Sequence, residues 1–274
     1  MMSEPESTPV LDIERPHSAR MYDYFLEGKD NYPADREAAE KVLAAAPNAR
    51  VMARENRAFM VRAARYLAGE VGIRQFLDIG TGLPTTPNLH EVVQAVAPDA
   101  RVVYTDNDPL VLVHARALLT STPQGRTAYL DADLRDPIAI LTAGEVRDTL
   151  DLRQPVALSL IAIMHFVEDA DDPYGLVAQL LDGLPSGSAL MLSHVTADHD
   201  PAVSEVAALY RTGGIPTAVR SRAEVGGFFG GLNLVTPGVA VVHRWRPDTS
   251  AAAVGDGGLR DAEVSVYGAV ALKP

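Results

Sequence analysis

The sequence predicts an α/β fold built on a mostly parallel β-sheet, and two patterns carry this prediction. From about residue 74 onward, short apolar runs alternate with stretches of helical periodicity. The apolar runs show no polar alternation, which is typical of parallel strands covered by helices on both faces. Helical segments come before this alternation, so we expect one α/β domain preceded by an N-terminal helical cap.

The expected elements follow from periodicity, composition and end signals. Five short apolar runs are typical of parallel strands: 75–79, 101–105, 127–130, 156–161 and 189–193. Five stretches are typical of helices: 33–46, 50–70, 89–97, 109–119 and 174–184. A further helix is expected after His199, and the glycine-rich stretch 221–231 indicates a helix end or a hinge. The segments 232–242 and 264–272 are expected to form a terminal antiparallel pair, with a loop at 256–258 between them.

These elements divide the chain into three predicted parts. Residues 1–16 are polar, acidic and rich in proline, and we expect a mobile tail there. Residues 17–72 form the predicted helical cap or lid, and residues 73–274 form the predicted α/β domain.

Composition narrows the possible partners. The 274 residues include 24 Lys and Arg against 36 Asp and Glu, a net charge of −12 that disfavours nucleic acid and anionic membranes as partners. Cysteine is absent, which excludes disulfides, zinc–thiolate sites and a thiol nucleophile. The N-terminus lacks the basic start and apolar run of a secretory signal, and no apolar stretch is long enough to span a bilayer as a helix. We therefore expect a soluble, cytoplasmic protein.

A glycine turn follows the first predicted strand in the sequence FLDIGTGLP, which contains Gly80, Thr81 and Gly82. The second predicted strand ends at Asp106, and the third is followed by Asp133. Because the carboxyl ends of parallel strands meet at one edge of a sheet, these groups are expected to lie together, where open α/β folds bind ligands. The alternative is that strand-end acids cap helices, as we expect for Asp108.

The same motif indicates the kind of nucleoside. A dinucleotide site prefers a third glycine, but Thr85 occupies that position, and Asp78 would lie beside a pyrophosphate. No phosphate-binding G-x-x-x-x-G-K-[ST] motif occurs in the chain. S-adenosylmethionine has no phosphate and carries a sulfonium and an ammonium, so a carboxylate at Asp78 suits it better than it suits NAD.

The chain resembles the class I S-adenosylmethionine-dependent methyltransferases in this glycine loop, in Asp106 and in Ala132-Asp133-Leu134. More narrowly, it is similar to an actinobacterial S-adenosyl methyltransferase family once catalogued as a domain of unknown function. This resemblance covers about residues 15–272 and rests on ARMYDYFLEGKDNYPADREAAE, FLDIGTGLPT, VVYTDNDPLVLVHARALL, YLDADLRDP and HFVEDADDPYG.

The resemblance implies a Rossmann-like, seven-stranded methyltransferase sheet over 73–274, with an antiparallel C-terminal pair. It implies that Gly80, Thr81 and Gly82 flank the methionine part of the cofactor and that Asp106 holds the ribose. Asn107 and Asp133 would contact the adenine, with Ala132 and Leu134 beside them. The class I methyltransferases in general often have a third glycine where this chain has Pro84, so the loop departs from the pattern after Gly82.

The resemblance also suggests contacts outside the loop. The aromatic-rich segment 19–32 would fold over the cofactor as a lid, with candidate contacts Tyr22, Tyr24, Lys29 and Asn31; alternatively, its aromatics pack on the core. His165, after the fourth predicted strand, is a candidate general base, although a packed histidine is the simpler interpretation. Apart from the resemblance, Arg54 and Arg57 on the next predicted helix are candidates for binding an acidic substrate or the cofactor carboxylate; the alternative is that they belong to a solvated helix face.

The expected function is transfer of a methyl group from S-adenosylmethionine to a small-molecule acceptor, leaving S-adenosylhomocysteine. The Asn/Asp-Pro-Pro-aromatic motif of nucleobase aminomethylation is absent after the fourth strand, and oxygen, nitrogen and carbon acceptors are all compatible. The alternative is a non-catalytic S-adenosylmethionine-binding sensor or partner-binding protein. No metal site is expected, because His194, Asp198, His199 and Asp200 lack a regular ligand spacing. His194 is expected to line the acceptor pocket.

Overall fold

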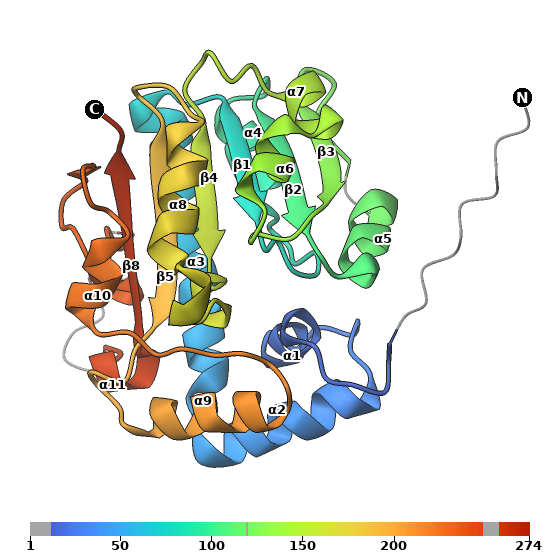
Figure 1. The fold of residues 1–274 in the computed structure, drawn as a ribbon, viewed down its shortest axis with the longest axis vertical. Helices are drawn as coiled ribbons and strands as arrows, with labels where there is room; N and C mark the ends of the chain where they lie inside the picture. The colour runs from blue at the N-terminus through green and yellow to red at the C-terminus, as the bar shows by residue number, and fades with distance from the viewer. Residues whose placement is uncertain (1–11, 119, 249–257) are drawn as a thin grey trace, which may run out of the picture.

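The computed structural model describes residues 12–118, 120–248 and 258–274, and its centre is a mixed β-sheet (Figure 1). The parallel strands are β1 (Gln75–Ile79), β2 (Arg101–Asp106), β3 (Arg126–Asp131), β4 (Ala157–Ile161) and β5 (Ala189–Val195). Antiparallel to β5 runs β8 (Val266–Leu272), which also pairs with the short strands β6 (Asn233–Leu234) and β7 (Ala240–Val241). The strand order is β3-β2-β1-β4-β5-β8-β6, with β7 also on β8.

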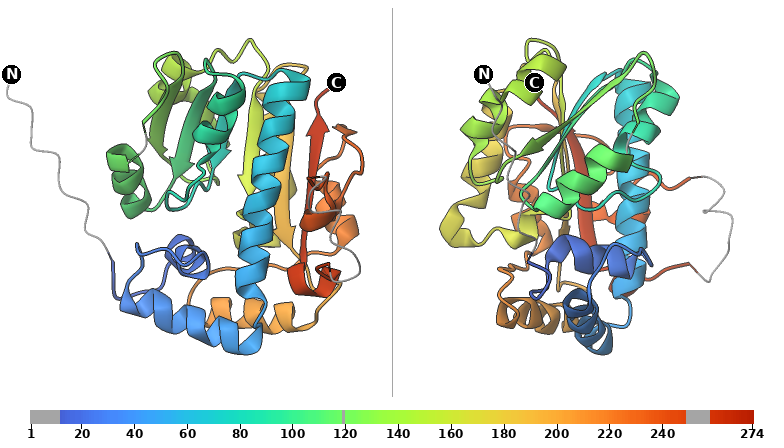
Figure 2. Two further views of the ribbon diagram at one scale, coloured as in Figure 1. Left: turned by 180° about the vertical axis from the view of Figure 1, so that it is seen from behind. Right: turned by 90° about the vertical axis from the view of Figure 1, so that its right-hand side faces the viewer.

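Helices cover both faces of this sheet. The N-terminal ones are α1 (Ser18–Phe25), α2 (Pro33–Ala45), α3 (Ala49–Tyr66) with a π-helical turn at Leu67–Val71, α4 (Leu89–Val96) and α5 (Pro109–Leu118). The later ones are α6 (Pro137–Thr142), α7 (Gly144–Thr149), α8 (Pro173–Asp182), α9 (Ala202–Thr212), α10 (Arg222–Gly227) and α11 (Asp261–Val264). Short 3-10 turns lie at Met164–Phe166, Asp169–Asp171 and Val242–Arg244. Figure 2 shows α3 and α4 on one face, with α6, α7 and α8 on the other.

The α/β fold with a mostly parallel sheet and antiparallel C-terminal strands is confirmed. One detail differs, because the segment 232–242 forms two strands of two residues each instead of one continuous strand. Between them the chain turns at Pro237 and at Gly238, whose φ is +82°, and proline has no N–H to donate to β8. The helices α6 and α7 were not predicted, and residues 256 and 257 of the predicted loop lie outside the described residues.

Two apolar clusters explain the arrangement of layers. The larger one joins the sheet to the helices on its faces and includes Phe59, Phe76, Leu158 and Met191, none of which is exposed. Burial of one such side chain typically stabilises a protein by about 1.5–3 kcal/mol. Since the central strands are covered on both faces, they are apolar throughout, which is the pattern that their sequence shows.

The second cluster holds a helical cap together at the carboxyl ends of the parallel strands. Met21 and Phe25 of α1, Val42 of α2 and Ala53 of α3 are buried in it. Tyr210, from α9 in the second half of the chain, packs against the same cluster, so the cap contains a helix from outside the predicted range 17–72. Figure 1 shows α1, α2 and α9 beyond the carboxyl ends of β1, β2 and β4.

The predicted division at residue 72 stays a prediction, as does the mobile tail, most of which lies outside the described residues. The helix α3 contributes Ala53 to the cap cluster and Phe59 to the sheet cluster, so it runs through both. Among the residues that the structure describes, no helix is long and apolar enough to cross a membrane.

Candidate active site

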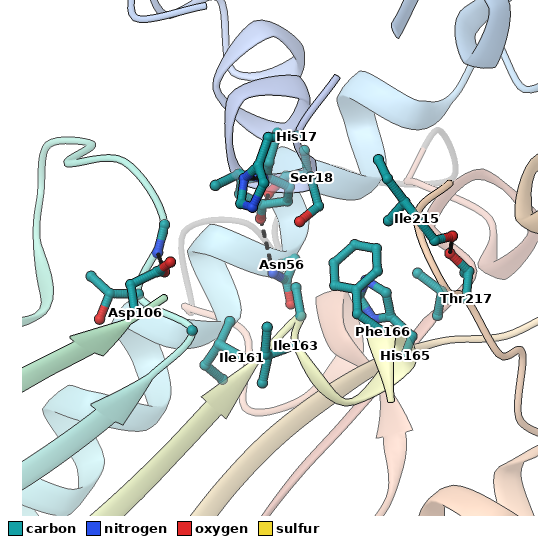
Figure 3. A pocket seen from close by; sticks show the side chains of 18 of the residues that line it. His17, Ser18, Asn56, Asp106, Ile161, Ile163, His165, Phe166, Ile215 and Thr217 are labelled. Atoms are coloured by element: carbon teal, nitrogen blue, oxygen red, sulfur yellow. Dashed lines mark hydrogen bonds between the residues drawn. The ribbon is translucent and has the colours of Figure 1, made fainter. Parts of the chain in front are cut away.

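A cavity of about 450 Å³ lies between the carboxyl ends of the parallel strands and the helical cap. Its walls come from the glycine loop after β1, the ends of β2, β3 and β4, and the cap helices α1, α2, α3 and α9. Figure 3 shows Asp106 at one side of this cavity and His165, Phe166 and Ile215 at the other, with Asn56 between them. The cavity therefore joins the predicted strand-end acids to the predicted base.

The glycine loop needs its glycines for two different reasons. Gly80 and Gly82 have φ values of +72° and +68°, a conformation that side chains disfavour. At Gly80 a Cβ would also lie 2.4 Å from Cγ1 of Ile163, in the loop after β4. At Gly82 a Cβ would meet nothing within 4 Å, so here the backbone is open to the cavity. The loop therefore packs against the β4 loop at one glycine and is open to a ligand at the other.

Asp78, at the end of β1, is a desolvated carboxylate in the cavity wall. The hydroxyl of Ser159, its register partner on β4, donates a hydrogen bond of 2.5 Å to its Oδ1. Burial raises the pKa of Asp78 to about 6, although the hydrogen bond from Ser159 and the charge of Arg57 oppose this shift. Arg57 itself is fixed to the glycine loop by hydrogen bonds from Nη2 to the carbonyls of Thr85 and Pro87.

Asp106, at the end of β2, is only 7% exposed and holds the glycine loop in place. The amide of Gly82 donates to its Oδ2 at 2.8 Å, and the amide of Asp108 donates to its Oδ1 at 3.0 Å. Burial raises the pKa of Asp106, and the nearby His17 opposes this shift. Asp108 accepts a hydrogen bond from the amide of Leu110 at 2.9 Å, which confirms its predicted role as a cap of α5.

The residues that follow β2 and β3 form the next part of the wall. Asn107, Ala132, Asp133 and Leu134 all line the cavity. The amide nitrogen Nδ2 of Asn107 donates to Oδ2 of Asp133 at 3.3 Å, which ties the ends of β2 and β3 together. Asp131, the last residue of β3, is exposed and does not line the cavity.

His165 lies in the 3-10 turn after β4, where it is 7% exposed and lines the cavity. Its Nδ1 is buried and has no hydrogen-bond partner among the residues that the structure describes. Burial lowers its pKa well below the usual value, and the nearby His194 and Arg220 lower it further. The imidazole is therefore neutral around neutral pH and can accept a proton.

Arg220 fixes the turn that carries His165. This guanidinium is 3% exposed and donates hydrogen bonds to the carbonyls of Met164 and Val167, and to Asp169. It also donates to Nε2 of His194 at 2.9 Å, which leaves Nδ1 of His194 to donate to the carbonyl of Val195. Burial lowers the pKa of His194 to about 4. The expectation that His194 lines the acceptor pocket is wrong, because the ring lies behind His165 and both its nitrogens are engaged.

A chain of hydrogen bonds links the β4 loop to the cap. The amide of Ala162 donates to Oγ of Ser193, and this hydroxyl donates to Oδ1 of Asn56. Asn56 is 2% exposed, and its Nδ2 donates to the hydroxyl of Tyr22, which donates in turn to the carbonyl of Ala53. The position of α1 over the cavity is therefore coupled to the loop after β4 through buried polar groups.

The structure brings only one of the four predicted lid contacts to the cavity. Tyr22 lines it, whereas Tyr24 hydrogen bonds with Glu40 and Lys29 is exposed. Asn31 is buried and donates to Asp23 and to the carbonyl of Gly28. These three side chains lie outside the cavity wall.

Of the two candidate arginines, Arg57 lines the cavity, whereas Arg54 pairs with Glu27 on the outside of the cap. Sequence reasoning missed His17, Asn56 and Arg220. Each lies among other polar residues, as Asn56 does between Glu55 and Arg57, so no local signal in the sequence distinguishes it. Among the described residues, no group of three or more acidic or histidine side chains is placed to hold a metal ion.

Comparisons with known proteins agree with this geometry. A family model described as S-adenosyl methyltransferase matches residues 4–274. The chain is similar to a DUF574 family protein of Streptomyces avermitilis MA-4680, with 55% identity, a TM-score of 0.92, and coverage of 96% of this chain and 99% of that one. It is also similar to a candidate methyltransferase of Thermobifida fusca YX, with 40% identity, a TM-score of 0.87 and coverage of 96% of each chain. No curated protein matches the chain.

Proposed function

The chain belongs to the S-adenosyl methyltransferase family, and from this membership we propose that it methylates a small molecule bound between the sheet and the cap. It is a methyltransferase that depends on S-adenosylmethionine; the acceptor and the roles of individual residues are the proposal. The observation that carries the proposal is the cavity, whose walls include Asp78, the glycine loop, Asp106 and His165.

The wall fits the chemistry of the cofactor. Each oxygen of the Asp106 carboxylate accepts one backbone amide, but a carboxylate oxygen can accept about two hydrogen bonds, so capacity remains for the two ribose hydroxyls. Asp78 is a desolvated carboxylate, and a cationic ammonium or sulfonium beside it would favour its charged form. The open backbone at Gly82 supports close approach of the methionine part.

The remaining roles follow from position along the wall. Gly80 and Thr81 complete the surface for the methionine part. Asn107, Ala132, Asp133 and Leu134 would surround the adenine, with Asp133 accepting from its amino group. The lid proposal now rests on Tyr22, because Tyr24, Lys29 and Asn31 have partners within the cap or face away from the cavity.

The size of the cavity supports a small acceptor. Sites for small ligands usually measure about 300–1,000 Å³, and this cavity lies near the lower end of that range at about 450 Å³. It must accommodate a nucleoside cofactor together with the acceptor. His165 would accept the proton that the acceptor loses, and a positioned base contributes about 10²–10⁴-fold to a rate.

The test is thermal stability with and without ligand. S-adenosylhomocysteine at about 100 times its Kd should stabilise the protein by about 2.7 kcal/mol and raise its Tm, whereas NAD should leave the Tm unchanged. Asp106→Ala should abolish this shift. Asp131→Ala, which removes an exposed carboxylate one strand away, should preserve it. Stabilisation by NAD and not by S-adenosylhomocysteine would contradict the proposal.

A second measurement separates an enzyme from a non-catalytic sensor. The purified protein is incubated with S-adenosylmethionine and the small-molecule fraction of a cell extract, and S-adenosylhomocysteine is quantified. The enzyme should form product in proportion to its concentration. Binding of the cofactor without any product would favour the sensor.

A further inference from the structure

We infer that the methyl acceptor is an uncharged, largely apolar small molecule that presents a hydroxyl group to His165 and is methylated on that oxygen. This inference rests on the proposed function, whose cofactor occupies the other part of the same cavity.

The part of the cavity that faces the cap is apolar. We call it the acceptor chamber and define it by Phe25, Val42, Ala53, Met60, Val206 and Ala207, all of which line the cavity. These side chains come from four helices, α1, α2, α3 and α9, and they join the cap cluster to the outer end of the sheet cluster. An occupant of this chamber would therefore exchange water for aliphatic and aromatic contacts, which favours an apolar molecule.

Most charged side chains of the wall lie in the other part. Arg135 also lines the cavity and donates to the carbonyl of Phe166, but its charge is paired with Asp133 and Asp171. Asp78, Asp106 and Asp133 end or follow the parallel strands, and Arg57 is bound to the glycine loop. None of the residues that define the acceptor chamber is charged, so an ionic acceptor there would lose its hydration without gaining a partner. This asymmetry argues against phosphorylated, carboxylate and ammonium acceptors.

His165 and Tyr210 are polar residues that line the cavity. The ring of His165 is buried against Phe166, with the ring centroids 4.3 Å apart, and among the described residues its buried Nδ1 has no hydrogen-bond partner. The neighbouring His194 cannot serve, because Arg220 and the carbonyl of Val195 engage its two nitrogens. The hydroxyl of Tyr22, also in the wall, is engaged with Asn56 and with the carbonyl of Ala53.

A neutral imidazole held in this way suits a hydroxyl acceptor. The hydroxyl oxygen forms a bond to the methyl carbon of S-adenosylmethionine, and its proton passes to the imidazole of His165. The electron pair of the broken S–CH₃ bond stays on sulfur, which becomes the thioether of S-adenosylhomocysteine, and the imidazolium then releases its proton to water. A simple aliphatic amine fits less well, because it is cationic near neutral pH and would have to lose a proton before entering the chamber.

The binding test uses the full-length chain loaded with S-adenosylhomocysteine and three probes that share one frame: 2-naphthol, 2-naphthoate and naphthalene. We expect saturable binding of 2-naphthol with a Kd at least ~10-fold below that of 2-naphthoate, since the anion has no partner in the chamber. Naphthalene should also bind more tightly than 2-naphthoate.

Two matched variants of α9 locate the binding. Val206→Asp places a charge in the acceptor chamber and should weaken 2-naphthol binding at least ~10-fold, whereas Leu209→Asp, on the exposed side of the same helix, should leave it unchanged. Binding of S-adenosylhomocysteine and the Tm of each variant report whether the fold is intact. Since Val206→Asp could disturb the cap, Ala207→Leu, which fills the chamber without adding charge, provides a second block and should also weaken 2-naphthol binding.

The methyl-transfer test uses S-adenosylmethionine labelled in its methyl group, with 2-naphthol or 2-naphthylamine as acceptor. We expect label in 2-methoxynaphthalene, and His165→Gln should lower kcat at least ~100-fold while the Kd of 2-naphthol changes less than about threefold. Equal or tighter binding of 2-naphthoate, no binding of any probe to the loaded protein, or labelling of the amine alone would overturn the inference. If S-adenosylhomocysteine itself does not bind, the proposed function fails instead.

Discussion

Replacing Asp78 by asparagine should make the free protein more stable while weakening its hold on the cofactor. The substitution keeps an oxygen that can accept the hydrogen bond from Ser159, but it removes the charge. Burial raises the pKa of Asp78 to about 6 from the ordinary value of 3.8, so the folded protein disfavours the ionised form. The asparagine variant carries no charge at this position and avoids this destabilisation. The difference in the free energy of unfolding between the two proteins must therefore depend on pH.

The sign and size of this pH dependence follow from the raised pKa of Asp78. A raised pKa means that the contribution of Asp78 to stability is fully present below about pH 3.8 and is lost as the pH rises through about 6. The shift of about 2 pKa units corresponds to about 3 kcal/mol at most, at about 1.4 kcal/mol per unit. Because one side of the carboxylate faces the cavity, where water can reach it, we expect about 2 kcal/mol.

The assay is urea unfolding of both proteins without ligand at about pH 4 and about pH 8. The stability of the asparagine variant should exceed that of the wild type by about 2 kcal/mol at the higher pH, or about 4–8 °C in Tm, and by little at the lower pH. At the higher pH, its affinity for S-adenosylmethionine should fall at least ~10-fold, since hydrogen bonds to charged groups are worth about 1.5–3 kcal/mol. Asp131→Asn, at an exposed strand end, should change neither quantity. Equal stability of the Asp78 variant and the wild type at about pH 8 would refute the desolvation argument.

Two further substitutions test the polar framework of the site. Arg220→Leu leaves two loop carbonyls and His194 without a donor and should destabilise the protein by about 2–4 kcal/mol in urea unfolding, even though Asp169 can return to water. Asn56→Ala breaks the link between Ser193 and α1 and should cost about 1–3 kcal/mol in the same assay; an equal loss in a double variant with Ser193→Ala would show that the two residues act together.

The sheet and the acids at its edge could be predicted because their signals are local. Each buried strand is a short apolar run in the sequence, and the predicted range 75–79 matches β1 at both ends. The rule that parallel strands end at one edge then brought Asp78, Asp106 and Asp133 together before any contact was known. The face of the sheet to which each side chain points follows from the strand register, and the pattern of buried residues in the sequence determines that register.

The cap could be predicted only in part, because some of its contacts join distant parts of the chain. The helices predicted within 17–72 correspond to α2 and α3. The helix α9 has the same amphipathic pattern as any surface helix, and no local signal indicates that Tyr210 packs against the cap. Tyr24 and Asn31 lie in the same aromatic-rich segment as Tyr22, but only Tyr22 lines the cavity. Because the side chains of a helix point in different directions around its axis, only some residues of such a segment can face the cavity.

The acidic run 168–172 shows why the loop after β4 was the hardest part to predict. The run is most simply interpreted as a solvated turn, yet Asp169 pairs with Arg220, Asp171 pairs with Arg135, and Asp172 caps α8 through the amide of Gly175. The partners of the first two lie 51 and 36 residues away, beyond the reach of any sequence pattern.

Arg220 is the residue on which this loop depends. Its charge is compensated by Asp169 at the surface, while its other donors hold the carbonyls on either side of His165. A buried cation near an imidazole also disfavours its protonation, and the pKa of His165 is lowered by Arg220 as well as by burial. One side chain therefore fixes the position of His165 and favours its neutral form, while it also lowers the basicity of the ring.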